Sequence, residues 1–161
     1  MKDQNHALRE HLLYLLRGGG AHLDFDAVTS GFPARLRGAK PTGLPHTAWS
    51  LVEHLRIAQN DILDFCRNPK YKELPFPSGY WPKHDSPPSA AAWDKSVKAF
   101  RADLKAMEKL VADKSTDLIA PIRHGGGQTI LREALLVADH NSYHLGQLVA
   151  LRQLLGAWPE K

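Results

Sequence analysis

The sequence predicts an all-α protein, a four-helix bundle with long connecting loops. Leu and Ala are frequent and β-branched residues are sparse, a composition that favours helix. Four long segments carry apolar residues at helical spacing, and stretches rich in Gly and Pro separate them. A chain of 161 residues can bury one sizeable core. We therefore expect residues 1–161 to form a single helical-bundle domain.

The first long helix is expected at residues 3–17, where leucines form an apolar stripe. The Gly-Gly-Gly run at 18–20 ends it. A short amphipathic segment follows at 22–29. Glycines and prolines punctuate the connection at 30–45, which we expect to be a loop.

The second long helix is expected at residues 47–67, and Asn68-Pro69 ends it. Either Thr47 or Ser50 can cap it, and Ser50 with Glu53 has the spacing of a capping box.

The second half of the chain contains two further long helices. They are expected at residues 89–113 and 129–155, joined by a loop that contains Pro121 and three glycines. The preceding stretch, residues 70–88, is rich in Pro and aromatic residues. Because it is too apolar for a free linker, we expect a long ordered loop that packs on the bundle.

Two histidines four residues apart carry the clearest chemistry of the chain. His140 and His144 lie on one face of the helix expected at 129–155, within a mostly apolar stripe. Buried imidazoles need partners, and one metal ion satisfies both. His54 lies on a similar apolar face of the helix expected at 47–67, which makes it the candidate third ligand. A hydrogen-bonded histidine network without metal is the alternative.

Three neutral imidazoles leave a divalent ion with its full charge and an open position, as in catalytic sites. Such an ion acidifies a bound water or thiol, which allows metal-assisted hydrolysis or thiol transfer to an electrophile. Imidazole suits several divalent metals, so the residues do not choose among zinc, nickel, iron and manganese. A site for iron with two histidines and one carboxylate stays open if Glu133 or Asp61 joins.

Two segments resemble the DinB/YfiT-like metalloenzyme family: residues 49–58 (WSLVEHLRIA) and, above all, residues 139–148 (DHNSYHLGQL). The resemblance extends over residues 3–155. It implies a divalent metal, commonly zinc or nickel, held by His54, His140 and His144. It also implies a homodimer. The characterised members of the family include transferases that act with low-molecular-weight thiols.

Five other residues on these helices have two readings each. Gln147 either touches a metal-bound water or substrate, or is hydrogen-bonded within the bundle. Tyr143 and Trp49 either line the mouth of a pocket or pack in the core. Asp61 and Glu133 either orient the ligand imidazoles or are ordinary interhelix or surface groups.

The remaining histidines and the cysteine are expected outside the metal site, and the role of His84 stays open. His84 lies in the aromatic loop that is expected to pack near the pocket, and His6, His11, His22 and His46 are expected at exposed or loop positions. His124 precedes three glycines, but no phosphate-loop pattern follows, so we expect a flexible turn. Cys66 is expected to be a buried small hydrophobe.

Composition excludes several classes of protein. The formal net charge is +4, and Lys and Arg are scattered apart from the stretch at 35–40, which argues against a nucleic-acid partner. A single cysteine allows no intrachain disulfide and suits a reducing compartment. No apolar run approaches the roughly 18 residues of a membrane span, and no signal region opens the sequence. We therefore expect a cytoplasmic protein that does not enter a membrane.

Two functions follow from these observations. The first is a divalent-metal-dependent enzyme, either a thiol-dependent transferase or a hydrolase, acting on a small-molecule substrate. The second is a non-catalytic stress-response module that binds a metal or a small molecule. An open metal position beside a pocket favours the first, whereas a saturated ligand set or the lack of a cavity favours the second.

Overall fold

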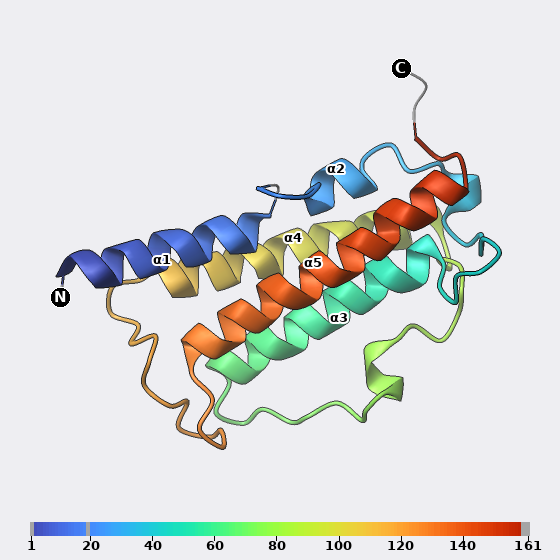
Figure 1. The fold of residues 1–161 in the computed structure, drawn as a ribbon. Coiled ribbons are helices and arrows are strands. Elements are labelled where there is room, and N and C mark those ends of the chain that lie inside the picture. The colour runs from blue at the N-terminus through green and yellow to red at the C-terminus, as the bar shows by residue number, and fades with distance from the viewer. Residues whose placement is uncertain (1, 19, 159–161) are drawn as a thin grey trace.

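The computed structural model describes residues 2–18 and 20–158. Four long helices build the bundle: α1 (Lys2–Arg17), α3 (Ala48–Arg67), α4 (Ala90–Ala112) and α5 (Ile130–Leu154). The connections hold one short helix, α2 (Phe25–Thr29), and two 3₁₀ turns, η1 (Ala34–Leu36) and η2 (Ser78–Tyr80). Each long helix packs along two others, in the order α1, α4, α3, α5 around the bundle (Figure 1). The predicted all-α bundle with long loops is confirmed.

Side-chain caps fix where three of the long helices begin. The side chains of Thr47, Ser89 and Thr129 each accept a hydrogen bond from the backbone N–H three residues later. These bonds satisfy amides that have no partner inside the helix. The long helices therefore begin and end within about one residue of the positions that the sequence predicts.

One capping prediction is wrong. The capping box of α3 pairs Thr47 with Ser50, whose hydroxyl accepts the Thr47 N–H at 2.8 Å. Glu53 does not take part, because its carboxylate binds Arg56 and Ser96. Thr47 begins the helix three residues earlier than a box of Ser50 with Glu53 requires.

The core consists of two apolar clusters along the bundle axis. The first gathers around Leu51 and Phe100, together with the second half of α5. The second gathers around Leu12, Met107 and Val137 near the other end. Each fully buried side chain of this size contributes about 1.5–3 kcal/mol, so packing, more than helix propensity, holds the bundle together.

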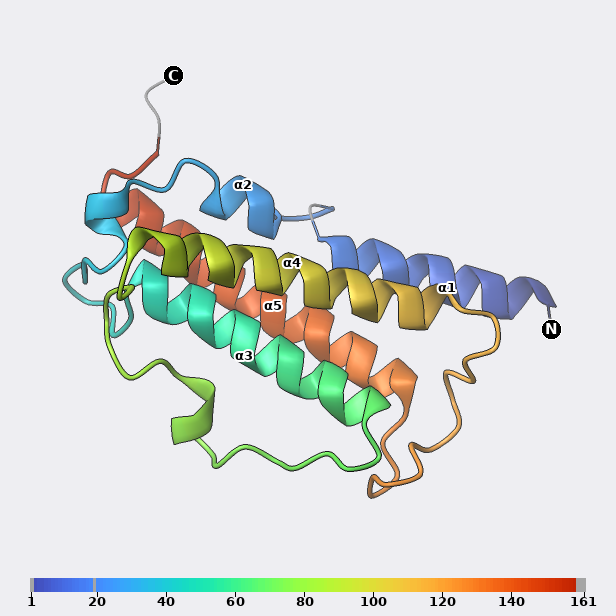
Figure 2. The same cartoon turned by 180° about the vertical axis from the view of Figure 1, so that it is seen from behind.

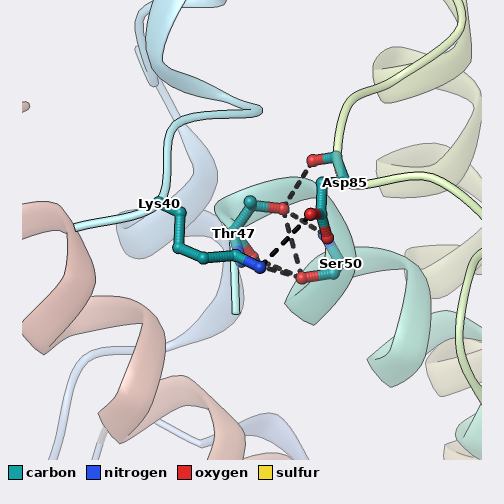
Figure 3. A network of polar contacts seen from close by, with 4 residues as sticks. All are labelled: Lys40, Thr47, Ser50 and Asp85. Carbon is teal, nitrogen blue, oxygen red and sulfur yellow. Dashed lines mark hydrogen bonds and ion pairs between the residues drawn. The ribbon is translucent and has the colours of Figure 1, made fainter. Parts of the chain in front are cut away.

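The loop at residues 68–89 runs along the outside of α3 and returns to the start of α4 (Figure 2). A polar network anchors its second half to the start of α3 (Figure 3). The Thr47 hydroxyl donates to the Asp85 carbonyl at 2.6 Å, and Lys40 Nζ lies 3.2 Å from the Asp85 carboxylate. This anchor holds the loop beside the histidine-bearing stretch of α3. Among the described residues, no helix has the length and hydropathy needed to cross a membrane.

Candidate metal centre

Three histidine side chains from two helices converge at one point. His54 comes from α3, and His140 and His144 come from adjacent turns of α5. His54 Nε2 lies 3.1 Å from Nε2 of both other residues, and one ring nitrogen from each of the three lies within 4.8 Å of the others. Nitrogens bound to one zinc ion lie about 2.0–2.1 Å from it, so separations of 3.1 Å suit a shared ion.

Hydrogen bonds on the far side of two rings fix their tautomers. His54 Nδ1 lies 2.8 Å from the backbone carbonyl oxygen of Tyr80, and a carbonyl only accepts. His144 Nδ1 lies 2.8 Å from Oε1 of Gln147. Both Nδ1 atoms therefore carry the proton, and in the neutral ring each Nε2 presents a lone pair.

These tautomers leave two lone pairs facing each other across 3.1 Å, those of His54 and His144. No hydrogen bond can form between two acceptors, so the contact is unfavourable unless a cation lies between them. Acceptors behind the rings and lone pairs in front are the usual arrangement of histidines that bind a metal. The donor set therefore fits a divalent ion.

Burial keeps the three rings neutral. His54 and His144 are each 7% exposed, and His140 is half-buried. Loss of hydration lowers the pKa of His54 and of His140 to about 4, and it lowers the pKa of His144 as well. The His144 ring also disfavours a positive charge on His54 and on His140, and His46 does the same for His54 and His144. The lone pairs are thus free for a ligand role at neutral pH.

Trp81, from the loop at residues 68–89, covers one face of His54. The two rings are parallel within 2°, and their centroids are 3.9 Å apart. The indole also stacks on His46, at 4.2 Å. The loop therefore places two groups against His54, the Trp81 ring and the Tyr80 carbonyl. Both groups restrict the rotation of the His54 side chain.

A pocket of about 500 Å³ opens beside the histidines. His54 and His140 line one part of it, and it extends between α3 and α5 toward the end where α3 stops and α5 begins. Its other walls are mainly aromatic and acidic, and they include Tyr71, Tyr80 and Glu133. A ligand in this pocket therefore lies against two of the three histidines, His54 and His140.

The sequence of this chain matches a known protein family. Residues 20–148, most of the chain, match the DinB superfamily. The chain therefore belongs to the DinB superfamily. The match leaves out α1 and includes all three histidines. Neither the curated proteins nor the solved structures gave a match.

Within this DinB bundle, the structure separates the readings that the sequence left open on α5 and α3. Gln147 is hydrogen-bonded inside the bundle, and its partner is the His144 ring. Trp49 packs in the core, whereas Tyr143 is 64% exposed and touches His144 with its ring at 4.9 Å. His84 is exposed and does not line the pocket.

The two carboxylates have other partners than the imidazoles. Asp61 accepts hydrogen bonds from the hydroxyls of Tyr71 and Tyr80. Glu133 is 2% exposed and pairs with Arg132 at 2.6 Å. Among the described residues neither belongs to the group of converging ligand atoms, so the reading with two histidines and one carboxylate gains no support.

The environment of Cys66 agrees with the prediction from sequence, whereas that of His46 was predicted only in part. Cys66 is partly buried against the second apolar cluster, and burial raises the pKa of its thiol to about 12. It is therefore the small hydrophobe that we expected, not a nucleophile. His46 lies in the loop before α3, as expected, but it is half-buried and stacks on Trp81. The contact of the Tyr80 carbonyl with His54 could not be predicted, because a backbone acceptor does not depend on the type of residue.

Proposed function

We propose that this DinB protein is a divalent-metal-dependent enzyme, a thiol-dependent transferase or a hydrolase, with His54, His140 and His144 as the metal ligands. One observation carries the proposal: two Nε2 lone pairs face each other at 3.1 Å while acceptors behind the rings hold the protons on Nδ1. A buried contact of this kind needs a cation.

Three protein ligands beside an open pocket are the composition of a catalytic metal site. The family resemblance favours zinc or nickel, whereas three imidazoles alone do not distinguish these metals from iron or manganese. When bound, such an ion acidifies a thiol or a water, so that a nucleophile forms near neutral pH. The proposed substrates are a low-molecular-weight thiol and a small organic electrophile.

The protein residues around the histidines have positioning roles in this proposal. The Tyr80 carbonyl and Gln147 orient the rings, and such partners raise the basicity of the ligand nitrogen. Trp81 excludes water from one face of His54. The apolar and aromatic walls of the pocket hold the body of the substrate next to the ligand nitrogens.

A non-catalytic binding module is the second candidate, and one observation favours it. Both carboxylates in the pocket that are best placed for acid–base chemistry already have partners, Asp61 with two tyrosines and Glu133 with Arg132. The third carboxylate of the pocket, that of Glu73, lies on an exposed part of the loop. A pocket whose helix carboxylates are already paired suits storage or sensing of a small molecule. In that case the metal and the walls retain a ligand without turnover.

Turnover of a model electrophile separates the two candidates. Zinc- or nickel-loaded protein is mixed with a low-molecular-weight thiol and 1-chloro-2,4-dinitrobenzene, and in parallel with 4-nitrophenyl acetate. The enzyme proposal expects metal-dependent product formation that His54→Ala abolishes and that the exposed control His84→Ala retains. No metal-dependent turnover with any thiol or ester contradicts it and supports the binding module. Dimerisation and a cytoplasmic location stay predictions.

A further inference from the structure

The pocket beside the histidines carries more negative than positive charge. Three carboxylates line it, those of Asp61, Glu73 and Glu133, against one guanidinium, that of Arg132. Arg132 and Glu133 neutralise each other at 2.6 Å. Among the residues that the structure describes, no Lys or Arg lies within 4.0 Å of the other two carboxylates. Two negative charges therefore face the pocket without a protein cation.

The Asp61 carboxylate is held in a fixed position by neutral donors. The Tyr71 hydroxyl donates to Oδ1 at 3.0 Å, and the Tyr80 hydroxyl donates to Oδ2 at 2.8 Å. Hydrogen bonds from neutral groups orient the carboxylate without cancelling its charge. Burial and the Asp61 charge raise the pKa of both phenols, that of Tyr80 to about 12, so both stay protonated donors.

Aromatic rings surround this fixed charge. The aromatic side chains in the pocket wall are Phe65, Tyr71, Phe76, Tyr80 and Trp81. The faces of aromatic rings attract ammonium groups, and a nearby carboxylate adds to this attraction. Asp61 lies seven residues after His54 on α3, which is about 10 Å along the helix axis. The anionic end of the pocket is thus two helical turns from the histidines.

We propose that the pocket takes an organic substrate with an apolar or aromatic body and an amine or quaternary ammonium group. The cationic group binds near Asp61 among the aromatic rings, and the other end of the molecule reaches the histidines. A volume of about 500 Å³ suits such a molecule. The word substrate rests on the proposed function, whereas the preference for a cation rests on the pocket alone.

The test compares two probes of matched shape, trimethyl(4-phenylbutyl)ammonium and the neutral 4-phenylbutanol. Their affinities for the full chain are measured by calorimetry at pH 7, with zinc and without it. The cation is expected to bind about tenfold more tightly than the alcohol in both preparations. Asp61→Asn is expected to remove this preference. The matched control Asp64→Asn changes a carboxylate of the same helix that does not line the pocket, and it is expected to keep the preference.

Equal binding of both probes, no binding of either at millimolar concentration, or a preference that survives Asp61→Asn overturns the proposal. If circular dichroism shows that Asp61→Asn does not fold, Glu73→Gln replaces it. Glu73 lies on an exposed part of the loop, and its substitution is expected to lower the preference about threefold. An unchanged preference in that variant overturns the proposal as well. Failure to bind zinc with an intact preference for the cation contradicts only the metal site.

Discussion

Two buried polar contacts join α3 to α5, and they are satisfied in different ways. Gln59 and Asn141 hydrogen-bond each other at 2.9 Å, and Gln59 also donates to the carbonyl of Phe100 on α4 at 2.8 Å. Each of these two bonds pairs an amide donor with an oxygen acceptor, although the Asn141 Oδ1 atom is buried without a hydrogen-bond partner among the described residues. In the second contact, His54 and His144 turn lone pairs toward each other, and their N–H groups point away.

The difference indicates which contact has a structural role and which belongs to a metal-binding site. A hydrogen bond between neutral side chains on two helices fixes the register of the helices without a bound ion. Two imidazoles whose Nδ1–H groups donate to other residues, and whose Nε2 lone pairs face each other, need a cation between them. The pair of Gln59 and Asn141 also lies between the two apolar clusters, whereas the histidines open onto a pocket. Chemistry is therefore expected at the histidines alone.

The largest expected effect is the loss of bound metal when one histidine ligand is removed. His140→Ala removes one of three donors, so protein purified without a chelator or a His tag should fall from about one divalent metal per chain to nearly none. Elemental mass spectrometry measures the content. His84→Ala serves as the control, because His84 is exposed and outside the pocket, and it should keep its metal. No metal in the unaltered protein, even after addition of zinc or nickel, would contradict the site.

Removal of the acceptor behind His144 is expected to weaken metal binding without abolishing it. Gln147→Leu deprives His144 Nδ1 of its partner, so the ring loses its fixed tautomer and orientation. Zinc affinity, measured by competition with a chelating dye, should fall about 10- to 100-fold. The matched control is Gln153→Leu, an exposed glutamine of the same helix. Equal affinities in the two variants would show that Gln147 does not position the ring.

The contact between Gln59 and Asn141 should affect stability but not metal binding. Asn141→Leu leaves Gln59 Oε1 without its donor, so the free energy of unfolding should fall by about 1–3 kcal/mol in urea titrations. Adding Gln59→Met removes the stranded group and should recover much of the loss. Metal content should stay at the level of the unaltered protein in both variants. A loss of metal in either would show that the two contacts are coupled.

The sequence predicted the bundle well because apolar spacing and capping residues are local signals. Thr47, Ser89 and Thr129 each precede a helix that begins where expected. The convergence of His54 with the pair on α5 also followed from the apolar faces on which these residues lie.

The parts that escaped prediction depend on long-range folding of a loop. The Tyr80 carbonyl meets His54 across 26 positions of the chain, and Trp81 stacks between two histidines. A stretch rich in Pro and aromatic residues indicates that a loop packs, but not which atom reaches which ring. The same limit applies to Asp61, whose two tyrosine partners come from that loop.

The smallest expected effect is the pH dependence of metal-free stability. Burial lowers the pKa of His54 and His140 to about 4, whereas in the unfolded chain both titrate near 6.5. Between pH 6.5 and 4 the unfolded chain therefore binds more protons than the native protein, and the free energy of unfolding falls as the pH falls. This stability is fully present above pH 6.5. Urea titrations of chelator-treated protein at pH 7.5 and 5 should show a smaller difference in His140→Ala than in His84→Ala. Equal differences in the two variants would mean that His140 is accessible to protons in the native bundle, and that the apolar stripe does not shield it.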